Sequence, residues 1–275
     1  MLNTLESIEI NVFLESIFLY YGFDLRGYEP EYLTKRLFSY MEKEGLMTIS
    51  SLQEKVLHQK DCFYRFVDFV TYGGSDMFND ASFFKALREK VFPILKDLDF
   101  IRIWVAGCST GEEVFSLAIM LREADLLGKC NIYATDINET SLEKAKTKKI
   151  PVAQMGIGSH NYLAGGGNHN FSQYFTFVNG DVLISEEIGR NMIWSRHNLI
   201  SDASFNEFNV ILCRYVLPNF SNKNWVAHAH KVLFESLTDS GILALGTTES
   251  INKTPYELNY TILDEENKIY LKTGY

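Results

Sequence analysis

The sequence predicts an α/β protein with a mostly parallel sheet covered by helices on both faces, preceded by a helical region. Three observations support this fold class. Apolar residues recur at helical spacing over residues 1–70, and residues 71–81 interrupt that periodicity. From Ile101 onward, strands alternate with helices, which is typical of a parallel sheet. The 275-residue chain is long enough for one large domain or two modest ones.

The N-terminal region is expected to be a small helical domain. A first helix carries Val12, Ile17 and Tyr20 at helical spacing and stops at Gly22. A second helix presents one apolar face over residues 33–41 before a glycine ends it, and a third begins near residue 50 or 51. These patterns predict ordinary packing faces.

The TYGGSDMFNDA segment, residues 71–81, is expected to be an extended linker loop, because paired glycines allow unusual backbone angles. Asp80 and Ser82 are expected to cap a helix over residues 83–95. The expected domain boundaries are 1–70 for the helical domain, 71–90 for the linker and helix start, and 91–275 for the α/β domain.

The α/β domain has a regular pattern with one interruption. Strands are expected at residues 101–106, 131–137, 209–217 and 241–246, helices at 114–126, 141–148 and 225–237, and a closing hairpin at 260–271. Between residues 150 and 190 the pattern is lost, glycines mark turns, and QYFTFV is typical of a strand. We therefore expect a small β-rich insertion there.

Composition excludes several classes of protein. The net charge of −9 disfavours nucleic acid as a partner, and the basic run at residues 144–149 is interpreted as a solvated helix face. No apolar stretch approaches the ~20 residues that a membrane span needs, and no signal peptide is evident. The four cysteines form no CxxC pair and are interpreted as apolar fillers, so no metal site is expected. We expect a cytoplasmic monomer without membrane insertion.

The main functional signal is AGCSTGEE, Ala106–Glu113, which follows the first strand of the α/β domain. Ligands of open parallel sheets bind at the carboxyl ends of strands, and Gly107 and Gly111 let the backbone approach a ligand. The GxGxxG pattern is absent, and two acidic residues at a helix start repel pyrophosphate but attract an ammonium group. The loop therefore favours S-adenosylmethionine over NAD, with a helix-capping loop that binds no ligand as the alternative.

The second signal is Asp136, at the end of YATDI. An acidic side chain at this position can accept hydrogen bonds from both ribose hydroxyls of a nucleoside. Its alternative role is a helix cap, for which Asn138 and Thr140 compete. The two signals together predict a site for an amino acid joined to a nucleoside.

These segments together resemble the chemotaxis receptor methyltransferase (CheR) family. The matching segments are AGCSTGEEVFSLAIML, YATDINETSLEKA, HNLI, FNVILCRYVL and GILALGTTESI, with SDMFNDASFFKALREKVFPIL before them. The resemblance spans nearly the whole chain. It implies a Rossmann-like catalytic domain with a small inserted β-subdomain, behind an all-α N-terminal domain.

The resemblance implies a reaction and a set of cofactor contacts. The family transfers a methyl group from S-adenosylmethionine to glutamate side chains on the cytoplasmic helices of chemoreceptors and releases S-adenosylhomocysteine. Glu113 would contact the cofactor's amino group, Asp136 its ribose, Asn198 and Leu199 its adenine, and Cys213 and Arg214 its methionine portion. Ala106 and Gly107 would begin the cofactor loop, and Ser75 would touch the cofactor from the linker, where the family usually has Thr.

Three positions depart from the family pattern on the acceptor side. Asn79 stands where the family has an arginine, and Asn219 where it has a tyrosine. Tyr215 replaces an asparagine, so its hydroxyl is a candidate acceptor contact. An arginine grips a carboxylate as a two-pronged fork, and losing one such donor can cost on the order of 2–4 kcal/mol of transition-state stabilisation. Two hypotheses follow: a glutamate methyltransferase, or an impaired family member that binds the cofactor and serves as a signalling or docking protein.

Overall fold

The computed structural model describes residues 4–71, 74 and 76–274, and the chain divides into two compact units. The first unit comprises Met1–Tyr72 with Pro218–Val226. The second comprises Gly73–Leu217 with Ala227–Tyr275.

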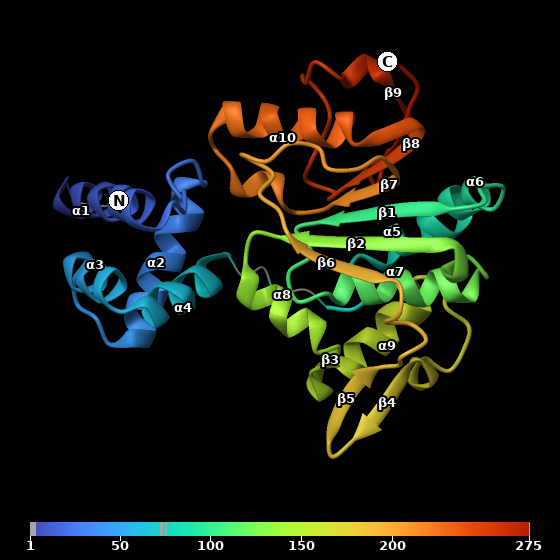
Figure 1. The fold of residues 1–275 in the computed structure, drawn as a ribbon, viewed down its shortest axis with the longest axis horizontal. Helices are drawn as coiled ribbons and strands as arrows, with labels where there is room; N and C mark the ends of the chain where they lie inside the picture. The colour runs from blue at the N-terminus through green and yellow to red at the C-terminus, as the bar shows by residue number, and fades with distance from the viewer. Residues whose placement is uncertain (1–3, 72–73, 75, 275) are drawn as a thin grey trace. The chain divides into compact units, whose positions relative to one another are not determined.

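The first unit contains four helices that surround an apolar core. They are α1 (Thr4–Tyr21), α2 (Pro30–Glu44), α3 (Ile49–His58) and α4 (Lys60–Thr71), drawn blue to cyan in Figure 1. Pro30 begins α2, and Gly45, with φ of 67°, ends it in the left-handed conformation that glycine adopts readily. Thr48 caps α3 by accepting a hydrogen bond from the Ser51 amide at 3.1 Å. The predicted helical character of this region is confirmed.

The buried face of α1 differs from the predicted one. Ile10, Phe13 and Ile17 are buried, with spacings of three and four residues. By contrast, Val12 is 51% exposed and Tyr20 is 68% exposed. The prediction that Val12 and Tyr20 share the packing face was therefore wrong, because α1 has apolar residues on more than one side.

The second unit is built on a seven-stranded sheet in the order β6-β2-β1-β7-β8-β10-β9. The strands are β1 (Ile101–Ala106), β2 (Cys130–Asp136), β6 (Met192–Arg196), β7 (Phe208–Cys213), β8 (Leu237–Leu245), β9 (Tyr260–Asp264) and β10 (Ile269–Lys272). The first five strands in this order pair in parallel, and β10 pairs with β8 and β9 in antiparallel fashion. The closing hairpin is thus confirmed, whereas β6 was not predicted.

The strand order reverses direction between β1 and β7. After β1 the chain passes to β2 on one side, while β7 lies on the other side of β1, with Val105 paired to Leu212. All three strands are parallel, so the loops that follow β1, β2 and β7 leave the sheet at one edge. This is the topological switch point at which open α/β sheets bind ligands.

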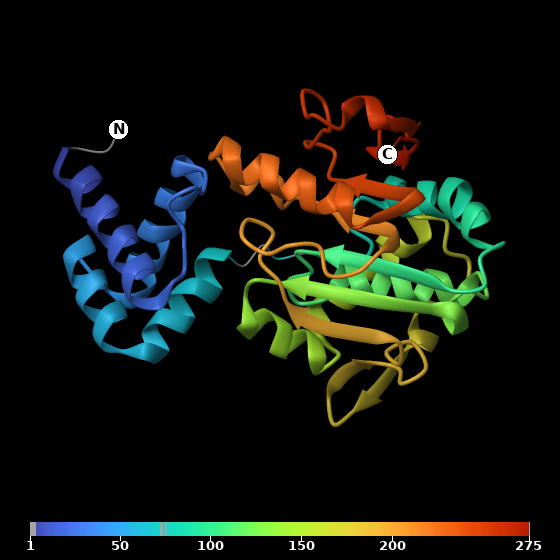
Figure 2. The same ribbon diagram turned by 45° about the horizontal axis from the view of Figure 1, so that its top comes forward.

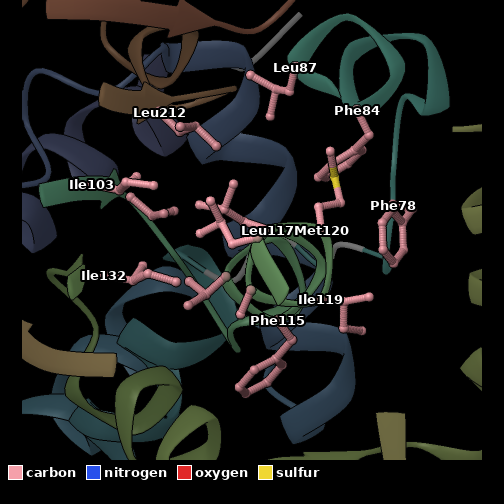
Figure 3. Close-up of a cluster of buried hydrophobic side chains, with 14 of the residues drawn as sticks. Phe78, Phe84, Leu87, Ile103, Phe115, Leu117, Ile119, Met120, Ile132 and Leu212 are labelled. Atoms are coloured by element: carbon pink, nitrogen blue, oxygen red, sulfur yellow. The ribbon is translucent and has the colours of Figure 1, made fainter. Parts of the chain in front are cut away.

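Alternating side chains of the sheet form two apolar layers. Ile103 packs with Leu117 of α7 (Glu112–Glu123) on one face, and Trp104 packs with Leu233 of α10 (Lys223–Glu235) on the other. Figures 1 and 2 show α10 on one side of the sheet, and α7 with α8 (Glu139–Lys146) on the other. Figure 3 shows the first layer, with α7 between the strands and the segment that follows the linker.

The segment after the linker is helical, as predicted, but its start differs. It consists of α5 (Ala81–Ala86), a π-helical turn (Leu87–Val91) and α6 (Phe92–Leu95). Asp80 occupies the cap position with φ of 59° but makes no side-chain capping bond, and the Ser82 hydroxyl donates to Asn267 instead. The capping prediction was therefore wrong, because the Asp80 carboxylate is engaged elsewhere.

The insertion contains the predicted small sheet and also a helix that was not predicted. The sheet is antiparallel in the order β3-β5-β4, from β3 (Lys149–Ile150), β4 (Phe175–Val178) and β5 (Asp181–Ile184). Helix α9 (Met155–Ala164) contains Gly156 and Gly158, which were expected to mark turns. A Cβ on Gly158 would lie 3.3 Å from the Met77 Cβ, so glycine allows α9 to approach the linker closely.

The described residues contain neither a candidate membrane span nor a candidate metal site. Over residues 4–71, 74 and 76–274, no helix combines the length and the apolar character needed to cross a bilayer. In the same part of the chain, no group of three or more histidine, cysteine or acidic residues is placed to hold a metal ion.

Candidate cofactor site

The loop that follows β1 is a tight turn tied to the end of β2. The amides of Gly107 and Cys108 both donate to the Thr135 carbonyl, at 2.8 and 2.9 Å. Gly107 has φ of 76°, and a Cβ there would lie 2.4 Å from Cγ2 of Val216, in the loop after β7. Glycine is thus required both for the backbone angle and for the close approach of these two loops.

Asp136 closes the same edge from the end of β2. Its two carboxylate oxygens accept hydrogen bonds from the Ser109 and Asn138 amides, both at 2.8 Å. The Ile137 amide also contributes a hydrogen bond to this carboxylate, and a lone pair that the three amides leave open can accept a hydroxyl donor. The pKa of Asp136 is raised above its ordinary value, because the effect of burial outweighs the opposing effect of the amide donors. The competing role as a helix cap belongs to Asn138, whose side chain accepts from the Ser141 amide at 3.1 Å.

Arg214 lies at the centre of the site, at the exit of β7. Its guanidinium pairs with Glu113 at 2.5 Å and with Asp80 at 2.6 Å, and its side chain is only 2% exposed. The guanidinium carbon also lies 3.9 Å from the ring centroid of Phe83. Burying a charge is costly unless it is paired, so two carboxylates and an aromatic face account for this cation. Asp80 is the site residue that sequence reasoning missed.

Tyr215 stands beside this ion-pair cluster. Its hydroxyl donates to the Asp80 carboxylate and lies 3.1 Å from the Thr247 hydroxyl. Its backbone has φ of 60°, which is uncommon for a residue other than glycine, and its side chain remains partly exposed. The structure therefore brings Tyr215 together with Arg214, Asp80 and Glu113.

Other predicted site residues lie at the same edge with less distinctive contacts. The Asn198 side chain accepts from the Ile200 amide at 3.2 Å, and Leu199 is buried in the layer beneath α10. Ala106 and Cys213 are buried at the ends of β1 and β7. Burial raises the pKa of the Cys213 thiol well above its usual range, so this thiol stays neutral and is no nucleophile.

The two asparagines predicted on the acceptor side belong to different compact units. Asn79 is exposed, at the end of the linker in the second unit. Asn219 belongs to the segment that clusters with the first unit, where its carbonyl accepts from the Glu29 amide at 2.7 Å. Ser75 lies outside the described residues.

The site has the donors and acceptors that a zwitterionic amino acid joined to a nucleoside requires. Two buried polar atoms at this edge, Ser109 Oγ and Arg214 Nε, have no hydrogen-bond partner among the residues that the structure describes. An unpaired guanidinium N–H suits a carboxylate, while the Glu113 carboxylate suits an ammonium group. Asp136 adds the acceptors for ribose. The residues therefore fit S-adenosylmethionine.

Comparison with known families agrees with this class of site. The family model described as the CheR methyltransferase SAM-binding domain matches residues 74–265, and the CheR methyltransferase all-alpha domain matches residues 8–71. Fold and site thus define an S-adenosylmethionine-dependent methyltransferase with a Rossmann-like domain. The chain belongs to the CheR methyltransferase family.

Two relatives illustrate the match over the whole chain. A protein of Pseudomonas putida named Cher3, itself a proposed methyltransferase, is 36% identical over 97% of both chains. The chemotaxis protein methyltransferase of Listeria monocytogenes is 27% identical over 94% of this chain and 98% of its own.

Proposed function

We propose that this methyltransferase forms methyl esters on glutamate side chains of chemoreceptor cytoplasmic helices. Relatives named chemotaxis protein methyltransferases, including one from Pseudomonas aeruginosa that is 27% identical, support a receptor as the partner. Because the proposed acceptor helices are cytoplasmic, we expect the reaction to take place in the cytoplasm. The family match supports an enzyme over a module that binds the cofactor without transferring its methyl group.

The observation that carries this proposal is the buried ion pair between Arg214 and Glu113. The two charges have the signs needed for an amino acid zwitterion: Glu113 binds the ammonium group and Arg214 the carboxylate. In the structure the two side chains pair with each other, and a bound zwitterion would offer each of them a partner of opposite charge. Asp80 keeps Arg214 paired and oriented throughout.

The nucleoside end is assigned to the neighbouring loops. Asp136 accepts the ribose hydroxyls, and Asn198 with Leu199 flanks the adenine. Ala106 and Cys213, whose small side chains end the two central strands, are assigned to the floor beneath the cofactor, together with Gly107, which directly follows Ala106. Ser75 is proposed as a contact from the linker on the family resemblance alone.

The chemistry requires positioning more than acid–base catalysis. When bound, S-adenosylmethionine supplies a methyl group on a sulfonium, which leaves as a neutral thioether. The acceptor glutamate is already ionised at neutral pH, since its ordinary pKa is about 4.3. Its oxygen forms the new C–O bond as the C–S bond breaks. The protein therefore contributes chiefly by aligning the carboxylate with the methyl carbon.

The acceptor carboxylate is assigned to the region of Tyr215. We place the Tyr215 hydroxyl and the Asn79 amide, both of the second unit, as donors that orient it. Asn219 is proposed as a further acceptor contact on the family resemblance alone. Neutral donors bind a carboxylate less strongly than a guanidinium does, so we expect slower transfer than in relatives that carry the arginine and the tyrosine.

The test is formation of base-labile methyl groups on receptor cytoplasmic fragments, using S-adenosylmethionine labelled in its methyl group. Label that is released as methanol by mild base supports a glutamate ester. Cofactor binding without any base-labile label contradicts the proposal. A receptor fragment whose candidate glutamates are changed to glutamine is the matched control and should remain unlabelled.

A further inference from the structure

A single buried carboxylate, Glu249, holds the loop that follows β7. Its Oε1 accepts from the amides of Val216 and Leu217, at 3.0 and 2.9 Å. Its Oε2 accepts from the amides of Tyr215 and Gly246, at 2.7 and 2.5 Å. Three consecutive amides of one loop and one amide at the end of β8 therefore converge on the same side chain.

These four hydrogen bonds compensate for the burial of the Glu249 carboxylate. The residue is only 4% exposed. A carboxylate has about four acceptor positions, and four amide N–H groups fill them. Hydrogen bonds from amides to a buried carboxylate are charge-assisted, and they are stronger than bonds between neutral groups.

The loop needs such a clamp because its backbone is strained. Tyr215 has φ of 60°. This left-handed conformation is unfavourable in free energy for any residue that carries a side chain. Its left-handed backbone helps successive amides to point to one side, where they form a concave anion-binding turn. Glu249 occupies that turn and compensates for the cost.

Gly246 leaves the space in which the clamp and the aromatic ring meet. A Cβ at this position would lie 2.6 Å from Oε2 of Glu249 and 2.8 Å from Cδ1 of Tyr215. The Tyr215 ring therefore packs directly against the backbone beside the carboxylate. Moving Glu249 would release both the loop backbone and the ring that carries the hydroxyl bound to Asp80.

We infer that Glu249 is a positioning residue of the cofactor site, which fixes the loop so that Arg214 faces Glu113 and Tyr215 faces Asp80. This inference rests on the proposed roles of Arg214 and Tyr215. Glu249 accepts its four hydrogen bonds from backbone amides, so it acts on both side chains through the backbone.

The experiment compares Glu249→Gln with the matched control Glu123→Gln. Glu123 is another buried carboxylate of the second unit, which pairs with Arg88 at 2.6 Å and accepts from the Tyr174 hydroxyl at 2.5 Å. Both substitutions remove a buried charge, but only the first removes the loop clamp. A second lesion of the clamp, Gly246→Ala, inserts a methyl group between the carboxylate and the Tyr215 ring.

Four quantities are measured: hydrogen–deuterium exchange of the amides at 215–217, affinity for S-adenosylhomocysteine by calorimetry, methyl-transfer kinetics, and the melting temperature. Glu249→Gln and Gly246→Ala should speed exchange at this loop at least about tenfold and weaken ligand affinity about tenfold. In the transfer assay, kcat should fall about tenfold while KM for the receptor stays within about twofold. Glu123→Gln should lower the melting temperature but leave loop exchange and affinity near wild type.

The outcomes separate this inference from the proposed function. If loop exchange and affinity in Glu249→Gln equal those of wild type, the positioning role is wrong. It is also wrong if Glu123→Gln speeds loop exchange and weakens affinity as much as Glu249→Gln does. If the wild-type protein fails to methylate receptors, the proposed function fails, while loop exchange and ligand affinity still test the clamp.

Discussion

One buried arginine between two carboxylates is the central feature of the candidate cofactor site. Arg214 pairs with Glu113 and Asp80, which come from α7 and the linker. Removing one partner of a buried pair is costly, because it leaves a charge uncompensated. Asp80 keeps Arg214 paired, and this frees Glu113 to bind an ammonium group.

The first prediction concerns Glu113. Glu113→Gln should weaken S-adenosylhomocysteine binding by about 10- to 100-fold, because a charge-assisted hydrogen bond to the ammonium group becomes a neutral one. Calorimetric titration measures this change. The control is Glu112→Gln at the adjacent carboxylate, which accepts from the Thr110 hydroxyl at 2.7 Å and should bind within about threefold of wild type. Equal losses in both variants would contradict the assignment.

The second prediction concerns pH. The ionised Asp136 carboxylate is the form that accepts ribose hydroxyls, and burial raises its pKa above the ordinary 3.8. Ligand affinity should therefore be full above the raised pKa and should be lost as the pH falls through it. Calorimetry across this range, with Asp136→Asn as the reference, measures the effect. The variant should bind weakly and without this pH dependence, so parallel curves for the two proteins would show that another group titrates.

The third prediction concerns the acceptor side. If Asn79 and Asn219 limit transfer, then Asn79→Arg combined with Asn219→Tyr should raise receptor methylation at least about tenfold, since one charge-assisted hydrogen bond contributes ~1.5–3 kcal/mol. Turnover is measured at saturating cofactor, so that changes in cofactor affinity do not contribute. Unchanged turnover would show that these substitutions do not explain the rate.

At the element scale, the close contact between the β1 and β7 loops gives the site its shape. Gly107 occupies a position where neither the backbone angle nor the space permits a side chain. The contact partner is Val216, which lies within the strained turn after β7. Small changes in either loop therefore act on both.

The fourth prediction tests this contact. Gly107→Ala should lower the free energy of unfolding of the second unit by about 2–4 kcal/mol, from left-handed strain and from the clash with Val216. Gly180→Ala is the matched control, because Gly180 has φ of 84° with nothing within 4 Å of its Cβ position. It should cost only about 1 kcal/mol. Denaturant titration measures both, and Val216→Ala should restore part of the loss in Gly107→Ala. No restoration would mean that the clash is not the cause.

Local sequence signals predicted the strand, loop and helix around residues 107–113, but they missed contacts between distant segments. The glycines and acidic residues of 107–113 lie between a predicted strand and a predicted helix, and Asp136 lies at the end of a predicted strand. Local sequence was therefore enough to place them. Asp80 pairs with Arg214, which lies 134 residues further along the chain. Because the partner is so distant, the local sequence around Asp80 indicated only a helix cap. Likewise, the glycines of α9 indicated turns, although Gly158 is small because α9 packs closely against Met77.

In the molecule as a whole, the two compact units differ in secondary structure. The first is all helical apart from loops, and the second carries the mixed sheet and every described residue of the ion-pair cluster. The side chains assigned to the cofactor's amino acid end therefore all belong to the second unit. The cytoplasmic location, the monomeric state and the lack of affinity for nucleic acid stay predictions.

The most direct test of the central claim is calorimetric titration of the full chain with S-adenosylhomocysteine. The account predicts one site per chain with a Kd on the order of 10 μM, within the range typical of enzyme ligands. It also predicts no heat of binding for the double variant Glu113→Gln with Asp136→Asn. Absence of binding by the wild-type chain, or equal binding by the double variant, would contradict the assignment of this edge of the sheet as the cofactor site.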